Sequence, residues 1–332
     1  MSKAYSYLLN SHLVFLNAIQ LKRLLLLCYG ICQAKTVNIS SIDKEIDSSM
    51  SGCKATAQYK WLMMAFQTGN ITPLMRQVFT WVLGLYYRGS GQVRILIDRT
   101  NWDIGQRRVN ILSIGILHDD RVFIPLLHED LGYKGNSDCA TRLNLIKILL
   151  EWWSLLDIPL PVFEVVGDRE FIGEAWLLEL ESLGITYVIR LKSNLQFHEW
   201  LAEEGMSERK IRVDNIMKDK HKIGVFSAEI VLGDLVITNL VSVLNDGNDK
   251  DKERYIYLIT NRKDIAESGN VYRKRWKIET CFKHLKTAGF NLEDMKLESP
   301  HKTDILMSLL SLVYAMTIYL GEEEKKSKIS SK

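Results

Sequence analysis

The sequence predicts an α/β protein in which a helical N-terminal region precedes a sheet-forming core, and three observations carry this prediction. Residues 5–90 show apolar positions at helical spacing and little strand character. Residues 92–191 alternate short apolar runs with longer amphipathic segments, the pattern of strands connected by helices. Residues 193–253 begin with a polar stretch and then become rich in runs of alternating apolar and polar residues. We therefore expect a helical domain at 1–88, a core at 91–192 and 254–320, a β-rich insertion at 193–253 and a charged tail at 321–332.

The N-terminal region combines helical patterning with an excess of positive charge. Helical runs span 21–31 and 59–66, and Pro73 suits the first turn of a last helix that ends near residue 87. Residues 1–90 contain nine Lys/Arg against three Asp/Glu. Such a module attracts a polyanion. The alternative is a helical packing extension that binds none.

The charge of the whole chain is only +3, but its distribution is uneven. Residues 91–253 contain nineteen Lys/Arg against twenty-seven Asp/Glu, whereas residues 254–332 contain fifteen against ten. A chain with cationic ends and an acidic centre fits a metal site flanked by surfaces for a polyanion, although chance asymmetry is the alternative.

The core region opens with three strand-like runs and a long helical pattern. The expected elements are strands at 92–97, 109–117 and 122–127, a helix at 138–153, a strand at 162–166, a helix at 173–183 and a strand at 186–191. Three consecutive strands, the first ending in an acidic residue, followed by a long helix form the order of the ribonuclease-H-like fold. After the insertion, a strand at 255–260 returns to the main sheet, and a helix at 304–320 closes the core.

Two aspartates follow strand-like runs of the core. Asp98 ends the first run, and Asp168 follows the fourth through Gly167. Carboxylates at the carboxyl ends of neighbouring strands converge in the crevice above a sheet. We therefore expect these two side chains to lie close together.

A third acid lies in the stretch VYRKRWKIETCFKHLKTAG near the C-terminus. As one continuous helix, this stretch places Tyr272, Arg275, Glu279 and Lys286 on one stripe about 60° wide, beside an apolar stripe that can pack on the core. The simplest alternative is a solvated face on which Glu279 pairs with a basic residue one turn away. If the helix instead packs across the sheet edge, Glu279 joins the two aspartates.

Three carboxylates that share one volume repel one another unless a cation lies between them. Mg²⁺ suits such a site, with Mn²⁺ as a substitute, because it binds few protein carboxylates and keeps room for water and phosphate oxygens. Two such ions, about 3.5–4 Å apart, activate a nucleophile and stabilise the leaving oxygen of a phosphodiester. The seven histidines show no spacing that indicates zinc.

The C-terminal stretch resembles a known family. Tyr272-x2-Arg275-x3-Glu279-x6-Lys286 matches the Y-x2-R-x3-E-x6-K signature of DDE transposases in the bacterial insertion-sequence-four group. Residues 97–102, IDRTNW, are similar to the group's first aspartate motif, and residues 166–171, VGDREF, to its second. The resemblance extends over residues 20–320, and its three motifs occur in the family's order.

This resemblance implies roles for individual residues. Asp98, Asp168 and Glu279 would be the catalytic metal ligands, holding two Mg²⁺ ions. Tyr272, Arg275 and Lys286 would bind DNA phosphates near the cleavage point, which agrees with the bidentate geometry of a guanidinium and the charge of an ammonium. Further candidate DNA contacts beside the second acid and after the fifth strand are Arg169, Arg190 and Lys192.

The resemblance also implies a reaction and its partners. Water would cleave double-stranded DNA at the terminal inverted repeats of an insertion sequence, and the freed 3′-hydroxyl would attack target DNA, in cut-and-paste transposition. A homodimer would pair the two ends, and the helical N-terminal domain would bind them. One rival is a metal-dependent nuclease on the same fold that never joins strands. The other is a non-catalytic DNA-binding relic, against which the three intact acids argue.

The remaining composition favours a soluble, cytoplasmic protein. The five cysteines are scattered without metal-knuckle spacing, which argues against a disulfide framework. The apolar run at 24–28 is too short to span a bilayer, and the one at 305–320 is interrupted by Ser308, Ser311 and Thr317. The first residues lack a convincing signal-peptide cleavage site, so we expect no membrane association.

Overall fold

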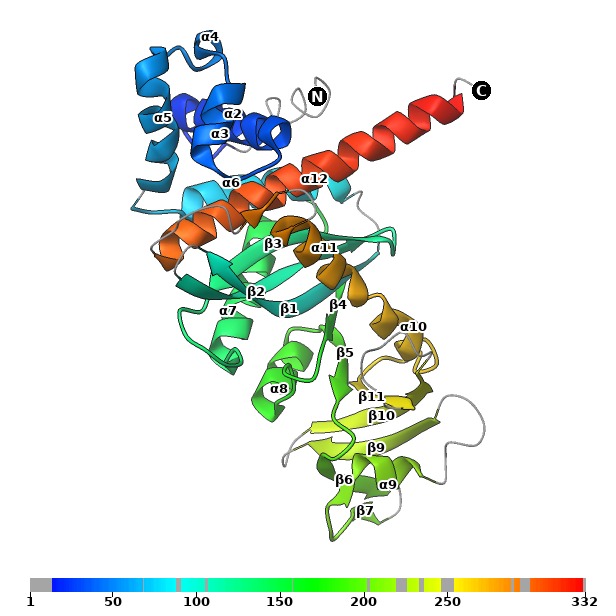
Figure 1. The fold of residues 1–332 in the computed structure, drawn as a ribbon. Helices are drawn as coiled ribbons and strands as arrows, with labels where there is room; N and C mark the ends of the chain where they lie inside the picture. The colour runs from blue at the N-terminus through cyan, green and yellow to red at the C-terminus, as the bar shows by residue number, and fades with distance from the viewer. Residues whose placement is uncertain are drawn as a thin grey trace.

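A computed structural model of the chain describes residues 14–67, 69–87, 91–104, 107–156, 158–201, 204–218, 226–232, 236–245, 254–287, 290–292 and 299–330. The first thirteen residues of the predicted helical domain lie outside these ranges, as do residues 219–225 and 246–253 of the predicted insertion and the last two residues of the predicted tail. Figure 1 shows helices at one end of the molecule, a sheet in its middle and a second group of strands at the other end.

The regular structure described between residues 14 and 87 is helical, as the apolar periodicity predicts. It consists of α2 (Ala18–Ala34), α3 (Ile39–Glu45), α4 (Ser48–Ser51), α5 (Ala55–Met63), a 3-10 helix (Met64–Gln67) and α6 (Thr72–Tyr86). A capping box begins α2, because the side chains of Asn17 and Gln20 each accept a hydrogen bond from the other's backbone N–H. At the end of α6, the Tyr86 hydroxyl donates to the carbonyl of Ala315 at 2.5 Å. The helical region is therefore packed on the C-terminal part of the chain.

The middle of the molecule is a sheet in the order β3-β2-β1-β4-β5. Its elements are β1 (Gln92–Ile104), β2 (Arg107–His118), β3 (Val122–Asp130), α7 (Cys139–Ser154), β4 (Val162–Gly167), α8 (Glu174–Ser182) and β5 (Thr186–Leu191). The first three strands are antiparallel, and β4 then pairs parallel with β1 and with β5. This mixed α/β arrangement is consistent with the ribonuclease-H-like order that the sequence predicts.

The strands of the predicted insertion continue the same sheet. β11 (Tyr255–Thr260) pairs antiparallel with β5, and the sheet then extends through β10 (Val236–Leu244), β9 (Phe226–Leu232), β6 (Gln196–Leu201) and β7 (Gly205–Met206). A short β8 (Ile211–Arg212) pairs with β6, and α9 (Val213–Met217) follows it. Each added strand satisfies the free backbone groups at the edge of the one before it.

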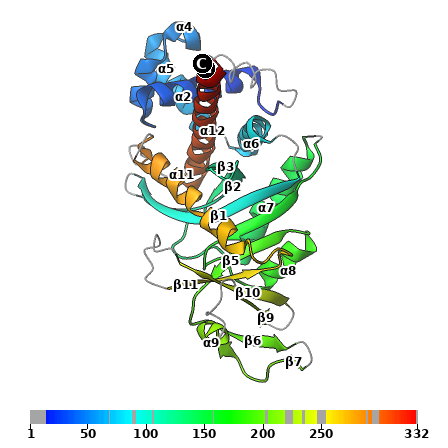
Figure 2. The same cartoon turned by 90° about the vertical axis from the view of Figure 1, so that its right-hand side faces the viewer.

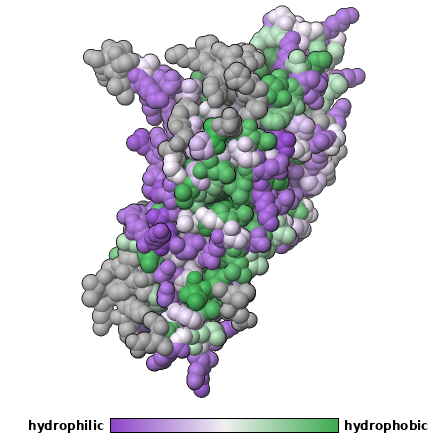
Figure 3. Space-filling model, turned by 180° about the vertical axis from the view of Figure 1, so that it is seen from behind, coloured by the Kyte–Doolittle hydropathy of each residue, from purple (hydrophilic) through white to green (hydrophobic). Residues whose placement is uncertain are grey.

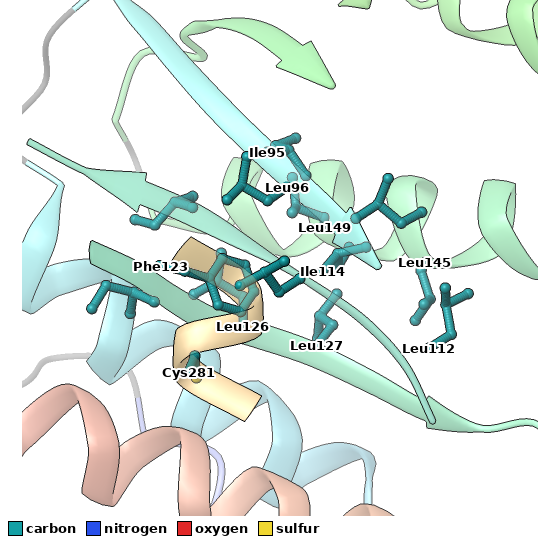
Figure 4. Packing of buried hydrophobic residues seen from close by; sticks show 14 of the residues in the cluster. Ile95, Leu96, Leu112, Ile114, Phe123, Leu126, Leu127, Leu145, Leu149 and Cys281 are labelled. Carbon is teal, nitrogen blue, oxygen red and sulfur yellow. The ribbon is translucent and has the colours of Figure 1, made fainter. Parts of the chain in front are cut away.

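Helices cover both faces of the sheet. Figure 2 shows α7 and α8 on one face, and α10 (Ser268–Arg273) with α11 (Trp276–Lys286) on the other. In the core, apolar residues of β1–β3 lie between Leu149 of α7 and Cys281 of α11 (Figure 4). Burying this apolar surface on both sides holds α10 and α11 against the strands that carry the two aspartates.

The stretch with the transposase signature is not one continuous helix, contrary to the helical stripe predicted above. α10 ends at Arg273 and α11 begins at Trp276. Across this junction the backbone N–H groups of Lys274, Arg275, Lys277 and Ile278 each donate to the carbonyl three residues earlier. Such tighter bonding replaces the four-residue spacing of an α-helix. Arg275 therefore lies at the junction of the two helices, with Tyr272 before it and Glu279 after it.

The last helix is longer than predicted. α12 spans Pro300–Ser330, so the predicted tail continues the helix as far as residue 330. Ion pairs one turn apart, Lys326 with Glu323 and Lys328 with Glu324, support this extension. Within the described residues, α12 is the one helix long and apolar enough to cross a membrane, and 67% of that apolar window is buried inside the protein. Burial of this kind is typical of a core helix.

The two broad faces of the molecule differ in character. Seen from behind, apolar residues gather in a strip along the middle of the surface between hydrophilic margins (Figure 3). The helices α10 and α11 lie on the opposite side, which faces the viewer in Figure 1. The acidic residues described next belong to that front side.

Candidate active site

Three elements bring the three predicted acids to one place. Asp98 lies within β1, Asp168 directly follows β4, and Glu279 lies in the first turn of α11. The parallel register sets Ile97 opposite Gly167, so the next residue on each strand is an aspartate. Since α11 crosses this part of the sheet, Glu279 faces the same volume.

The position of Asp168 depends on a glycine and a tight turn. A Cβ on Gly167 would lie 3.0 Å from the Cβ of Phe171 and 3.2 Å from a methyl group of Ile97, closer than most side-chain contacts. The backbone N–H of Phe171 donates to the carbonyl of Asp168 at 2.9 Å, and the Phe171 ring is fully buried. The glycine thus permits the close approach that turns the chain and leaves the Asp168 carboxylate at the sheet edge.

The guanidinium of Arg275 joins two of the acids. Its Nη1 donates to Asp98 Oδ2 at 2.7 Å, and its Nη2 donates to Glu279 Oε1 at 2.7 Å. Only 8% of the Arg275 side chain is exposed, against 15% for Asp98 and 37% for Glu279. The other oxygen of Asp98 accepts the backbone N–H of Arg99 at 2.8 Å. Both oxygens of the first acid are therefore hydrogen-bonded.

The second acid, Asp168, is held by a tyrosine of the same signature. The Tyr272 hydroxyl donates to Asp168 Oδ1 at 3.1 Å, and the Arg275 guanidinium lies 5.7 Å from the Tyr272 ring centre. Tyr272 is itself buried, beside the guanidinium of Arg190. Four members of the predicted site (Tyr272, Arg275, Asp168 and Asp98) thus form one connected group with Glu279.

The electrostatics of this group follow from burial and from crowding of like charges. Burial raises the pKa of Asp98 to about 6, Arg275 and the Arg99 N–H oppose the rise, and Asp168 and Glu279 add to it. Burial also raises the pKa of Tyr272 to about 12. Burial by itself would lower the pKa of Arg275, but Tyr272 and the three acids outweigh it and raise that pKa. The cluster therefore favours a positive charge at its centre.

The donor set fits a hard divalent cation. All three acids offer carboxylate oxygens, the ligands that Mg²⁺ and Mn²⁺ prefer, and their charges destabilise one another without a cation. Within the described residues, no three His, Cys, Asp or Glu side chains are arranged to hold a metal ion together. In this conformation the guanidinium of Arg275 lies between the carboxylates of Asp98 and Glu279.

The remaining predicted contacts differ in their access to a ligand. Lys286 ends α11, about two turns beyond Glu279, and is partly buried; Arg169 is also partly buried. Lys192 follows β5 and is exposed. Arg190 is only 3% exposed, so in this conformation it faces the protein and Tyr272 rather than the surface.

One supporting ion pair was not identified from the sequence. On the far face of the sheet, Arg99 Nε donates to both oxygens of Glu170 at 3.1–3.2 Å. Arg99 also donates to Asn110 at 2.8 Å and to Asn136 at 3.2 Å. Arg99 directly follows the first acid, and Glu170 lies two residues after the second. Their opposite charges beside the two motifs were the available signal, but only the fold reveals their proximity.

A charge network centred on a buried acid was also not identified from the sequence. Glu164 of β4 is fully buried and accepts hydrogen bonds from Arg94 Nε at 2.8 Å and from Arg262. Arg94 continues to Asp120 at 2.5 Å, and Lys274 reaches the same carboxylate at 2.5 Å. Because Lys274 adjoins Arg275, this network ties the junction between α10 and α11 to the sheet.

One protein-family model matches most of the chain. The family model described as the transposase DDE domain matches residues 89–316, which include the three acids and all six predicted DNA contacts. No curated protein matches the sequence.

Comparison with solved structures gives weak likenesses. Endonuclease V from Bacillus subtilis is 13% identical, with a TM-score of 0.27, and the match covers 77% of this chain and 96% of that one. The Marinitoga piezophila Argonaute in complex with a 5′ OH guide RNA is 8% identical, with a TM-score of 0.24, over 82% of this chain and 38% of that one. At such low TM-scores neither likeness supports a conclusion about this chain.

Proposed function

Because the chain belongs to the transposase DDE-domain family, we propose that it cleaves DNA at the ends of an insertion sequence and joins those ends to target DNA. Membership in the family establishes the transposase class. The cut-and-paste route, the strand-transfer step and the insertion-sequence-four group are the proposal, and the spacing of Tyr272, Arg275, Glu279 and Lys286 supports that group.

One observation carries the proposal. Asp98, Asp168 and Glu279 are 70 residues or more apart in sequence, yet they meet around Arg275 and Tyr272 beside the inner strands β1 and β4 of a mixed sheet. A group with this charge is costly to assemble unless it binds something, since like charges brought together in a partly buried site repel.

In this proposal, the acids bind metal ions and the other signature residues bind DNA phosphates. Asp98, Asp168 and Glu279 would hold two Mg²⁺ ions, which supply a nucleophile at neutral pH and charge stabilisation for the leaving oxygen. Arg275 offers a planar, bidentate donor for a DNA phosphate, and Tyr272 offers one hydroxyl. Lys286, two turns along α11, adds a point charge for the phosphate backbone.

The N-terminal helices and the oligomeric state complete the proposal. We propose that the basic helical region at 1–88 binds the terminal inverted repeats and that two copies of the chain pair the two ends. The packing of α6 on α12 means that this region also stabilises the core. The two roles are compatible, because the exposed surfaces of α2–α5 remain available to DNA.

A cleavage and joining assay tests the proposal. The protein is incubated with Mg²⁺, a duplex carrying the DNA that flanks its own gene and a second target duplex, and cut and joined products are mapped on both strands. We expect Glu279→Gln to lower the rate of cleavage by at least about 100-fold, because it removes a metal ligand, while end binding is retained. The matched control is Glu267→Gln, an exposed carboxylate of the same segment that bonds Asn270.

The outcomes separate the three candidate functions. Cleavage with joined products supports the transposase. Nicks without joining to the second duplex indicate the nuclease. Specific binding without any metal-dependent cleavage by the wild-type protein indicates the relic. Cleavage that survives Glu279→Gln at the wild-type rate removes Glu279 from the site.

A further inference from the structure

The Arg275 side chain occupies the place where this carboxylate cluster requires a positive charge. Its two terminal nitrogens bond Asp98 and Glu279 at 2.7 Å each, and the side chain is 8% exposed. Charge-assisted hydrogen bonds of this kind are strong, and the low local dielectric increases their strength. One guanidinium therefore compensates two of the three acids while no other cation is bound.

This arrangement competes with a divalent ion. Asp98 Oδ1 accepts the Arg99 N–H and Asp98 Oδ2 accepts Arg275, so both oxygens of the first acid are already engaged. A divalent cation at the same oxygens would also be repelled by the guanidinium. The acids reach their full capacity as ligands only after Arg275 moves away from Asp98 and Glu279.

Arg275 has one unused donor that a phosphate would satisfy. Within the described part of the chain, its buried Nε finds no hydrogen-bond acceptor. A phosphate accepts two parallel N–H bonds from a guanidinium, including one from Nε, whereas the two acids engage only the terminal nitrogens. An unsatisfied buried donor destabilises the protein, and a phosphate would remove that cost.

We propose that Arg275 is the resident cation of the acid cluster in the DNA-free protein, and that a DNA phosphate withdraws it and so frees the acids to bind divalent ions. The inference rests on the proposed function and adds a regulation to it: DNA and metal bind with positive coupling through one side chain. Because such coupling is reciprocal, DNA raises metal affinity by the same factor by which metal raises DNA affinity.

The first measurement is the Mn²⁺ affinity of the full chain, followed by electron paramagnetic resonance with and without a short duplex from the element end. The same measurement with Asp98→Asn, which lacks one of the three proposed metal ligands, determines how much Mn²⁺ the duplex binds by itself. We expect the duplex to raise the protein's Mn²⁺ affinity by about fivefold or more, and Mn²⁺ to raise the duplex affinity by the same factor.

The second measurement repeats this with Arg275→Gln. Without the resident cation, the free variant is expected to bind Mn²⁺ about tenfold more tightly than the wild type, and the duplex should then raise that affinity little further. Lys277→Gln removes an exposed positive charge two residues away and serves as the control for general electrostatics. It should retain the wild-type coupling.

Thermal unfolding gives a readout that does not depend on activity. Metal-free Arg275→Gln should unfold at a lower temperature than the wild type, because its acids are uncompensated, and Mn²⁺ should raise its Tm by more than it raises that of the wild type. If this variant does not fold, Arg275→Lys replaces it. A lysine cannot bridge both acids, so the coupling should fall.

Other results would overturn the inference. Equal Mn²⁺ affinities for the wild type and Arg275→Gln, or undiminished coupling in Arg275→Gln or Arg275→Lys, would overturn the resident-cation inference and leave the proposed function standing. A wild-type protein that binds no divalent ion with or without DNA would overturn the inference and the proposed metal site together.

Discussion

A buried carboxyl group in α12 links the stability of this protein to pH. Burial raises the pKa of Asp304 to about 7, and the charges of Asp130 and Glu129 add to the rise, although the backbone N–H of Asp130 donates to Asp304 at 3.0 Å. In the unfolded chain the same group has its ordinary pKa of 3.8. The folded state therefore binds this proton more tightly than the unfolded state does.

The sign of the effect follows from proton linkage. Where the folded state holds more protons, the free energy of unfolding falls as pH rises. The contribution of Asp304 is therefore fully present below about pH 4 and is lost as pH rises through 7. We expect Asp304→Asn to flatten the pH dependence of the free energy of unfolding between pH 4 and 7, by up to a few kcal/mol. Urea denaturation at successive pH values measures this free energy. If its pH dependence is the same in Asp304→Asn and the wild type, Asp304 is not the group responsible.

The sequence singled out side chains that the structure brings together, and their chemical roles stay predictions. The spacing of the signature located Tyr272, Arg275 and Glu279, because residue types that bind metal or phosphate are few and their order is visible. The bond from Arg275 to Glu279 is the pair one turn apart that the sequence offered as an alternative, whereas the bond from Arg275 to Asp98 was not predicted. That bond joins residues 177 apart in sequence, and helical periodicity does not encode such a contact.

At the scale of elements, the strands and helices of the core follow from the pattern of apolar residues. The periodicity predicts β1–β5, α7 and α8, since burying one face of each element is a local requirement. The pairing of β11 with β5, and the continuation of the sheet through β10 and β9, join residues far apart in sequence. A local pattern contains no signal for such partners.

The ion pair between Arg99 and Glu170 acts between elements and is open to measurement. It ties β1 to the turn after β4, with side chains that are 15% and 16% exposed. We expect a double-mutant cycle with Arg99→Met and Glu170→Gln to give a coupling energy of roughly 1–2 kcal/mol in urea denaturation, because the pair is largely shielded from water. The pair should also hold the first two acids at a fixed separation.

A matched surface pair provides the control for this cycle. Lys147 of α7 and Glu179 of α8 lie 3.4 Å apart but are 57% and 44% exposed. Their coupling should stay below about 0.5 kcal/mol, as for other exposed pairs. A cycle for Arg99 and Glu170 that gives no more than this control would show that the two motif segments are held by their backbone turns alone.

At the scale of the whole molecule, one buried anion connects distant regions of the chain. Glu164 bonds Arg94 of β1 and Arg262 after β11, and Arg94 continues through Asp120 to Lys274 between α10 and α11. The central sheet, the added strands and the signature helices therefore meet in one charge network. All five residues lie in the predicted core, 91–192 and 254–320, so the network joins parts of the core that are far apart in sequence.

Glu164→Gln tests how much of the architecture depends on this anion. The substitution leaves Arg94 and Arg262 close together without a buried negative charge, and breaking a buried pair in this way costs about 3–5 kcal/mol. We expect a corresponding loss in the free energy of unfolding measured with urea. High salt should change this loss little, because Glu164 is fully buried and salt screens buried charges weakly. Glu229→Gln, an exposed carboxylate on β9, should change stability by less than about 0.5 kcal/mol. A loss as small as that of the control would mean that the strands, rather than the network, hold the two halves of the sheet together.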